Sequence, residues 1–475
     1  MANSSLLSPS LTQSFGNLLL DSDSYKASHW LQYPPDTRYI SSYIEPRGGV
    51  FEQTVFFGLQ AYLLEYLSKP ITQQDIDEAD LLLTAHGVPF YRAGWQYILD
   101  QYQGRLPIQI EAVPEGMRVP CQNAVVQVIN TDPACYWLTS FLETALLRAV
   151  WYPSTVATQS WQCREIIRAA MEKSCDSLDG LPFKLHDFGA RGVSSQESAA
   201  LGGLAHLVNF AGTDTLSALI AASRWYGMRQ PDQVAGFSIP AAEHSTMTSW
   251  GRAGEVDAYR NMLKQFGGAG KLVAVVSDSY DLWHAIDALW GDVLRDDIRQ
   301  MGGTLLIRPD SGDPVKVVRE ALQRLAVRFG THLNQKGYKV LPDCVRLIQG
   351  DGINPVSLQH ILDAVLAAGF SVDNLAFGMG GGLLQQVDRD TLGWAMKASS
   401  ANVAGEWRDV YKDPITSRSK RSKRGRLALV EGEHGLETIR ESALQGRPNL
   451  MQPIFRNGEL LRQETLSQIR ARVGW

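Results

Sequence analysis

The second half of the chain repeats one pattern, in which a short apolar segment is followed by a loop rich in acidic residues or glycine. Each apolar segment is typical of a buried strand, and four of them lie at 272–276, 305–307, 345–348 and 375–377. Helical segments separate them, with a repeat of roughly 30–50 residues that suits a β/α unit. Such alternation builds a parallel sheet with right-handed crossovers. The pattern therefore predicts an α/β protein with an irregular parallel β/α barrel, and a doubly wound open sheet is the alternative.

The helices between these strands have clear boundary signals. Asp313-Pro314 is an N-cap followed by a proline in the first turn, and Gly330 ends the apolar stripe that follows. Asn354-Pro355 and Gly369 bound the next predicted helix in the same way. Earlier strands of the same series are predicted at 183–185, 207–210 and 236–239.

The rest of the chain has a different organisation. Strands are predicted at 39–43 and 124–129, and helices at 57–67 and 137–150. A basic loop, 417–426, lies near the C-terminus. The expected parts are a disordered leader, an N-terminal mixed α+β domain, the barrel, and a C-terminal segment that packs on the N-terminal domain, at 1–15, 16–153, 154–400 and 401–475.

Composition excludes several classes of protein. A net charge of −5 gives no global basic field that would recruit nucleic acid. No apolar segment reaches the roughly 18 residues that a membrane span needs. The five cysteines are scattered and never spaced C-x-x-C, which argues against a disulfide framework or a zinc site. These features predict a cytoplasmic protein that binds neither membrane nor nucleic acid.

The loops after the predicted strands carry the chemistry. They lie at 277–281, 308–312, 349–352 and 378–382. Because the carboxyl ends of parallel strands meet at one face of a barrel, these loops are expected to share a site. Carboxylates there can hold ribose hydroxyls or Mg²⁺, glycine loops admit phosphate to backbone N–H groups, and arginine matches phosphate oxygens in pairs. The loops predict a site for a phosphorylated sugar with a metal ion.

Seven motifs follow one another along the chain: DSYK at 23–26, QYPP at 32–35, HDFGARGVSSQE at 186–197, GTDT at 212–215, PAAEHS at 240–245, RPDSG at 308–312 and QGDG at 349–352. With the glycine loop and the basic loop, this set resembles the nicotinamide phosphoribosyltransferases of the barrel-type (type II) phosphoribosyltransferase family. The resemblance covers nearly the whole chain. It implies transfer of the phosphoribosyl group of phosphoribosyl pyrophosphate to nicotinamide, which gives nicotinamide mononucleotide and pyrophosphate in NAD salvage. It also implies Mg²⁺, coupled ATP hydrolysis and a homodimer with shared active sites.

The resemblance implies roles for individual residues. His244 is implied to be phosphorylated transiently by ATP, Asp278 to orient its imidazole, and Asp310 to complete the catalytic set. The implied nicotinamide contacts are Tyr25 (from the partner subunit), Phe188, Arg191, Asp214 and Arg308. The implied contacts to phosphoribosyl pyrophosphate and phosphate are Arg47, Asp310, Gly350, Asp351, Gly380, Gly381, Arg389, Lys397, Lys412, Lys420 and Arg421.

Taken alone, some of these residues have ordinary structural explanations. Phe188 is typical of a core residue, Asp214 of a helix cap, and His244 of a structural histidine, while the basic loop is typical of a solvated segment. The resemblance implies that the Asp214 carboxylate distinguishes nicotinamide from nicotinate. It accepts a hydrogen bond from the carboxamide of nicotinamide and repels the carboxylate of nicotinate.

Two alternative functions remain open at this point. One is nicotinate phosphoribosyl transfer on the same fold, and the other is a catalytically idle signalling or scaffold protein. The presence of His244, Asp278, Asp310 and Asp351 argues against an idle protein. A dinucleotide-dependent dehydrogenase is disfavoured because the chain lacks G-x-G-x-x-G at a strand–helix junction.

Overall fold

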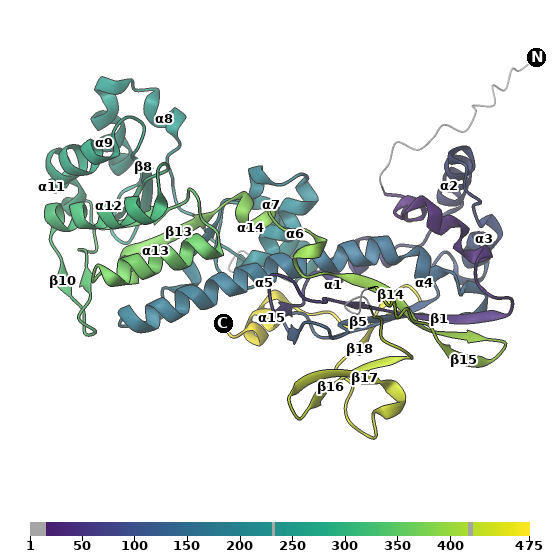
Figure 1. Cartoon of the computed structure of the whole chain (residues 1–475). Helices are drawn as coiled ribbons and strands as arrows, with labels where there is room; N and C mark the ends of the chain where they lie inside the picture. The colour runs from purple at the N-terminus through teal and green to yellow at the C-terminus, as the bar shows by residue number, and fades with distance from the viewer. Residues whose placement is uncertain (1–15, 230–232, 417–420) are drawn as a thin grey trace, which may run out of the picture. The chain divides into compact units, whose positions relative to one another are not determined.

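The computed structural model describes residues 16–229, 233–416 and 421–475, which form two compact units (Figure 1). Unit 1 holds the described residues up to 155, together with 225–227 and those from 388 onward. Unit 2 holds the described residues of 156–224 and 228–387. The leader predicted at 1–15 and Lys420 of the basic loop lie outside the described residues.

Unit 1 is built on a seven-stranded antiparallel sheet with the strand order β15-β14-β1-β5-β3-β18-β19. Its strands are β1 (Thr37–Glu45), β3 (Ile108–Ala112), β5 (Val126–Asn130), β14 (Ala395–Val403), β15 (Glu406–Asp409), β18 (Gln452–Arg456) and β19 (Glu459–Leu460). The strands predicted at 39–43 and 124–129 are confirmed as β1 and β5. A small hairpin pairs β2 (Gln53–Val55) with β4 (Arg118–Pro120), and another pairs β16 (Leu427–Gly432) with β17 (Gly435–Arg440).

The division between the units follows strand pairing. β14 pairs with β1 along its length, from Val403 opposite Thr37 to Ala395 opposite Glu45. Since β1 belongs to the N-terminal part, this pairing draws β14 into unit 1, so the second division falls at 387/388, whereas the prediction placed it at 400/401. β18 joins the same sheet through β3.

The helices of unit 1 cover this sheet and include two that the sequence predicts. The helix predicted at 57–67 is α1 (Leu59–Tyr62) continued by η3 (Leu63–Leu67), and the one predicted at 137–150 begins as α4 (Leu138–Phe141). The others include η1 (Leu18–Leu20), η2 (Ser24–Leu31), α2 (Gln73–His86), α3 (Arg92–Tyr102), α15 (Leu466–Val473) and the first part of α5 (Glu143–Ser174), which continues into unit 2.

A buried polar network explains why distant segments belong to unit 1. The Gln60 side-chain amide donates to the carbonyl oxygens of Trp225 at 2.7 Å and Glu464 at 2.9 Å. The Tyr226 hydroxyl donates to the fully buried Glu115 carboxylate at 2.8 Å. Because buried polar groups need partners, these contacts fix residues 225–227 and the C-terminal segment against the N-terminal part.

Unit 2 contains a six-stranded parallel sheet with the order β7-β6-β13-β12-β9-β8. Its strands are β6 (Leu185–Asp187), β7 (Gly212–Thr213), β8 (Leu272–Val276), β9 (Thr304–Arg308), β12 (Val345–Gln349) and β13 (Leu375–Met379). Residues 237–241 connect its two edges, because Phe237 bridges Gly212 of β7 and Ala241 bridges Ala274 of β8, both in parallel. The ring therefore closes through a segment with isolated bridges, and the predicted irregular β/α barrel is confirmed.

The four strands of the repeating pattern are confirmed, and β8 has the predicted bounds. The strand predicted at 207–210 is wrong, because α6 (Gln196–Leu207) extends into this segment. Its apolar residues are buried at the end of a helix, and a short apolar segment alone does not separate a buried strand from a buried helix. The strand predicted at 183–185 begins only at Leu185, after the short helix η5 (Leu181–Phe183).

Helices alternate with the strands of unit 2. The predicted caps are confirmed in α12 (Pro314–Phe329) and α13 (Pro355–Ala367), where the Asp313 and Asn354 side chains accept backbone N–H groups. α12 packs against α13 and β12 (Figure 1). The remaining helices include α7 (Leu216–Trp225), α8 (His244–Thr248), α9 (Glu255–Phe266), α10 (Leu282–His284), η9 (Ala285–Val293), α11 (Arg295–Gln300) and α14 (Gly381–Leu384).

Two global features concern the chain's environment. All five cysteines are free thiols. Among the described residues, no helix is both long enough and apolar enough to cross a membrane.

Candidate active site

Phe188 is the first residue after β6, and its ring lies across the ends of two neighbouring strands. A Cβ atom on Gly378 of β13 would lie 1.8 Å from the ring carbon Cε2, and one on Gly350, just after β12, would lie 3.3 Å from it. Glycine at both positions therefore makes room for the ring. The ring is half-buried against the barrel interior, where Ala274, Leu306 and Ile348 form an apolar cluster. One aromatic surface thus sits at the barrel mouth.

Asp214 follows β7 and pairs with His186, whose ring centroid lies 5.2 Å from that of Phe188. His186 Nε2 donates to Asp214 Oδ1 at 3.0 Å, and the Ser238 hydroxyl donates to the same oxygen. Burial acts to raise the pKa of Asp214, but the hydrogen bonds from His186 and Ser238 and the charges of His186 and Arg308 together hold that pKa below its ordinary value. Asp214 is therefore an anion at neutral pH, and it accepts hydrogen bonds.

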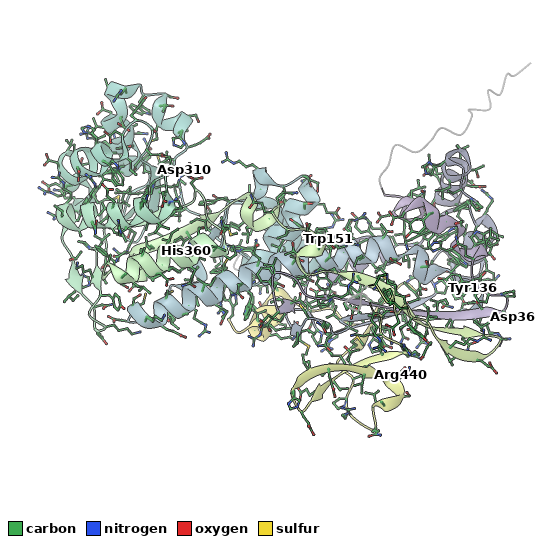
Figure 2. The ribbon with its side chains drawn as sticks, viewed as in Figure 1. Asp36, Tyr136, Trp151, Asp310, His360 and Arg440 are labelled. Carbon is green, nitrogen blue, oxygen red and sulfur yellow. The ribbon has the colours of Figure 1, made fainter. Side chains whose placement is uncertain are left out.

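Arg308 ends β9, and Asp310 in the loop after it lies between Arg308 and His244. One Arg308 guanidinium nitrogen lies 3.2 Å from Asp310 Oδ2. Asp310 Oδ2 also lies 3.9 Å from His244 Nδ1. Asp310 therefore stands between the Arg308 cation and the imidazole, in the loop labelled in Figure 2.

His244 opens α8 and is held by a buried carboxylate. Its Nε2 donates to Asp278 Oδ1 at 2.9 Å, while the Ser311 hydroxyl donates to Asp278 Oδ2 at 2.6 Å. The Asp278 side chain is 6% exposed and that of His244 is 42% exposed. Because a carboxylate only accepts hydrogen bonds, the Nε2 position carries a proton, and Nδ1 is the ring nitrogen that lies toward Asp310.

The glycine loop after β13 lies at the same end of the barrel. Gly380 precedes α14, and a Cβ atom on Gly381 would meet no atom within 4 Å, so the space on the side-chain side of Gly381 is open. A Cβ atom on Gly192 would lie 3.0 Å from the Cα of Gly381, which places η6 (Ala190–Gly192) and its exposed Arg191 against the loop. Asp351 is exposed in the loop after β12.

A second cluster of predicted residues lies in unit 1. A cavity of about 460 Å³ is lined by four predicted cations, Arg47, Arg389, Lys397 and Lys412. Arg421 has a different neighbour, with its Nε 3.5 Å from Asp413. This cavity has the charge and the volume for a polyphosphate group.

Tyr25 also belongs to unit 1, where η2 presents it with 57% of its surface exposed. Its neighbour Lys26 is buried and pairs with Glu143 at 2.9 Å. Glu143 also lines the cationic cavity, so Lys26 and Glu143 connect the Tyr25 segment to it.

The structure thus brings the predicted site residues together in two groups, one in each unit. The barrel group consists of Phe188, Arg191, Asp214, His244, Asp278, Arg308, Asp310, Gly350, Asp351, Gly380 and Gly381. Two residues absent from the prediction are Ser238 and Ser311, which donate to Asp214 and Asp278. Ser311 stands inside the RPDSG motif, which was a usable signal, whereas Ser238 has no local signal because only ring closure brings it to Asp214.

Comparison with known proteins decides the family. A model of the nicotinate phosphoribosyltransferase (NAPRTase) family matches residues 183–458, and one of the nicotinamide phosphoribosyltransferase N-terminal domain matches residues 17–110. A nicotinamide phosphoribosyltransferase from Xanthomonas campestris pv. campestris is 57% identical over 96% of this chain and 97% of its own. The chain belongs to the nicotinamide phosphoribosyltransferases of this family.

Other relatives agree with this assignment. A nicotinamide phosphoribosyltransferase from Acinetobacter baylyi is 32% identical and covers 95% of this chain and 96% of its own. Among solved structures, the nicotinate-nucleotide pyrophosphorylase from Pyrococcus furiosus aligns with a TM-score of 0.63 at 15% identity, over 98% of this chain and 97% of its own. The human nicotinic acid phosphoribosyltransferase aligns with a TM-score of 0.56 at 16% identity, over 95% and 92%. These two share the fold.

Proposed function

We propose that this enzyme transfers the phosphoribosyl group of phosphoribosyl pyrophosphate to nicotinamide, which gives nicotinamide mononucleotide and pyrophosphate for NAD salvage. The observation that carries the proposal is the Asp214 carboxylate at the barrel mouth, paired with His186, whose ring centroid lies 5.2 Å from that of Phe188. The family of the chain agrees with it.

The base is recognised by stacking and by charge. Phe188 offers one aromatic face to the flat pyridine ring. Asp214 accepts a hydrogen bond from the carboxamide N–H₂ group, whereas the carboxylate of nicotinate would face a like charge. His186 and Ser238 hold Asp214 Oδ1, which leaves Oδ2 for the base.

The reaction is a displacement at the anomeric carbon of the ribose. The pyridine nitrogen forms the new C–N bond with its lone pair, and the C–O bond to pyrophosphate breaks with its electron pair. The pyridine nitrogen carries no proton, so the reaction needs no base. Asp310 and Asp351 hold the ribose hydroxyls, and placement of the reactants with neutralisation of the leaving group supplies most of the acceleration.

Backbone N–H groups and cationic side chains bind different phosphate groups. Gly380 and Gly381 donate backbone N–H groups to the 5′-phosphate, next to Arg191. The cations that line the cavity of unit 1 bind the pyrophosphate or the ATP phosphates.

Mg²⁺ fits the same site. The described residues include no group of three or more His, Cys, Asp or Glu side chains placed to hold a metal ion. Mg²⁺ commonly binds through one or two carboxylates together with substrate phosphates. Asp310 and Asp351 are the carboxylates in place for this, and the bound ion would neutralise charge on the departing pyrophosphate.

ATP hydrolysis is coupled through His244. The Nδ1 lone pair of His244 attacks the γ-phosphorus of ATP, the P–O bond to ADP breaks, and water later releases the phosphate from the imidazole. Asp278 keeps the proton on Nε2 and stabilises the positive charge that develops on the ring. His244 does not act on the ribose.

A product assay tests the assignment. The purified enzyme, with phosphoribosyl pyrophosphate, Mg²⁺ and ATP, should form nicotinamide mononucleotide with a kcat/KM far above that for nicotinate. Asp214→Asn should narrow the gap, because it removes the repulsion. Asp343→Asn, an almost fully exposed carboxylate of unit 2, is the matched control and should leave the gap unchanged. Equal or reversed kcat/KM values in the wild type would favour the nicotinate alternative.

A labelling experiment tests the histidine. Incubation with γ-labelled ATP should give an acid-labile, base-stable label, which His244→Ala abolishes while some basal synthesis remains. His360→Ala, an exposed histidine on α13 labelled in Figure 2, should keep the label. Label that persists in His244→Ala refutes the coupling role and leaves the transferase assignment intact.

A further inference from the structure

Asp187 is the last residue of β6, and it is fully buried directly beneath the base site. One carboxylate oxygen, Oδ1, accepts the backbone N–H of Gly189 at 2.7 Å. The other, Oδ2, accepts the hydroxyl of Thr213 at 3.0 Å. Gly189 follows Phe188, and Thr213 precedes Asp214, so a single carboxylate connects the two loops that carry the base-recognising side chains.

Backbone contacts reinforce this connection. The N–H of Asp214 donates to the carbonyl oxygen of Asp187 at 3.0 Å, and the N–H of Phe188 donates to that of Met379 at 2.9 Å. Thr213 Oγ in turn accepts the N–H of Thr215 at 2.9 Å. Hydrogen bonds therefore fix the backbone on either side of Phe188 and Asp214, whereas the side chains of these two residues remain available to a ligand.

Helix α6 covers the carboxylate. A Cβ atom on Gly203 would lie 3.1 Å from Asp187 Oδ2 and 2.8 Å from the Cβ of Ala218, so the helix backbone passes directly over it. A buried charge is costly unless hydrogen bonds satisfy it, and here the donors come from the two loops that carry Phe188 and Asp214. The loops that the carboxylate joins point to a role in the site.

We propose that Asp187 is a positioning residue for the pyridine base. This role rests on the proposed function. Asp187 fixes the distance between the Phe188 ring and the Asp214 carboxylate. Asp187 touches neither substrate. It acts by setting where the two recognition groups stand, so its loss should weaken binding of the base and the choice between bases, and spare the phosphoribosyl end of the site.

Two substitutions test the connection from its two sides. Asp187→Asn keeps the shape and the Gly189 contact but replaces the acceptor that faces Thr213. Thr213→Val removes the hydroxyl and keeps the branched shape. Each should raise KM for nicotinamide about tenfold, the scale of one lost hydrogen bond to a buried charge. Each should also reduce the preference over nicotinate, while kcat and KM for phosphoribosyl pyrophosphate stay within about twofold of the wild type.

The double variant gives a stricter test. If both residues act through one connection, Thr213→Val should add less than about a further twofold to KM in the Asp187→Asn background. Asp287→Asn is the control, because Asp287 holds Arg324 and Arg328 in unit 2 and contacts no site residue of the barrel group. It should lower the Tm and leave KM for nicotinamide unchanged.

Different outcomes overturn the positioning role and the proposed function. Variants that lower the Tm but keep the wild-type KM for nicotinamide, or that raise both substrate KM values alike, overturn the positioning role. Calorimetric titration of nicotinamide into each variant measures the affinity for the base in the absence of the reaction. A wild-type enzyme that prefers nicotinate refutes the proposed function instead, and that result is visible before any variant is compared.

Discussion

Gly378→Ala should damage recognition of the base without touching any group that contacts phosphate. The new Cβ atom would stand 1.8, 2.2 and 2.6 Å from three ring carbons of Phe188, and ordinary contact begins at 3.4 Å. Gly378 is buried in β13, which is hydrogen-bonded to β6 on one side and to β12 on the other. Because the strand is fixed on both sides, the Phe188 ring is the part that must move.

The size of the effect follows from this geometry. The ring edge must retreat by about 1.6 Å to reach ordinary contact. A misplacement of about 1 Å can cost on the order of 10²-fold in rate, so kcat/KM for nicotinamide should fall about 10- to 100-fold. The same overpacking should cost roughly 1–3 kcal/mol in the free energy of unfolding. Steady-state kinetics with each substrate varied in turn, together with thermal unfolding, measures both quantities.

Two comparisons make the test decisive. Gly180→Ala adds the same methyl group in unit 2, where its nearest neighbour is Lys184 Cε at the ordinary contact distance of 3.8 Å, and it should leave KM unchanged. In a Phe188→Ala background the clash disappears, so Gly378→Ala should add little to the loss already caused by the missing ring. If Gly378→Ala lowers kcat/KM for nicotinamide by the same factor in the Phe188→Ala background as in the wild type, a clash with the ring is not the cause.

Two further predictions concern unit 1. Burial raises the pKa of Glu115 from 4.5 to about 7, so the wild type should lose on the order of 3 kcal/mol of stability as the pH rises from about 4.5 to above 7. Glu115→Gln should therefore gain in Tm over the wild type between about pH 5 and pH 8, and a constant difference would contradict the titration. Co-expression of Tyr25→Ala with Asp310→Ala, each inactive alone, should restore up to about a quarter of the sites, because a randomly paired dimer with shared sites can hold one intact site. Verified heterodimers without activity would exclude the shared site.

Local residue patterns predicted the repeating elements and their ends. The apolar segment 272–276 is β8, and the caps at Asp313 and Asn354 open α12 and α13. These features depend on neighbouring residues, because caps satisfy the first backbone N–H groups of their own helix. The rule that parallel strands direct their carboxyl ends to one face also predicted that the loops with Asp278 and Asp310 share a site, and the family resemblance added His244, which lies against both.

Contacts between distant segments became visible only in the folded chain. β14 joins unit 1 because its backbone groups pair with β1, more than 300 residues away in the chain. The segment 237–241 closes the barrel because both edge strands need partners, and this closure brings Ser238 to Asp214. Asp187 likewise joins the loop with Gly189 to the loop with Thr213, and α6 buries it, only in the folded chain. Hydrogen-bond partners and burial depend on residues far apart in the sequence, so local patterns do not specify them.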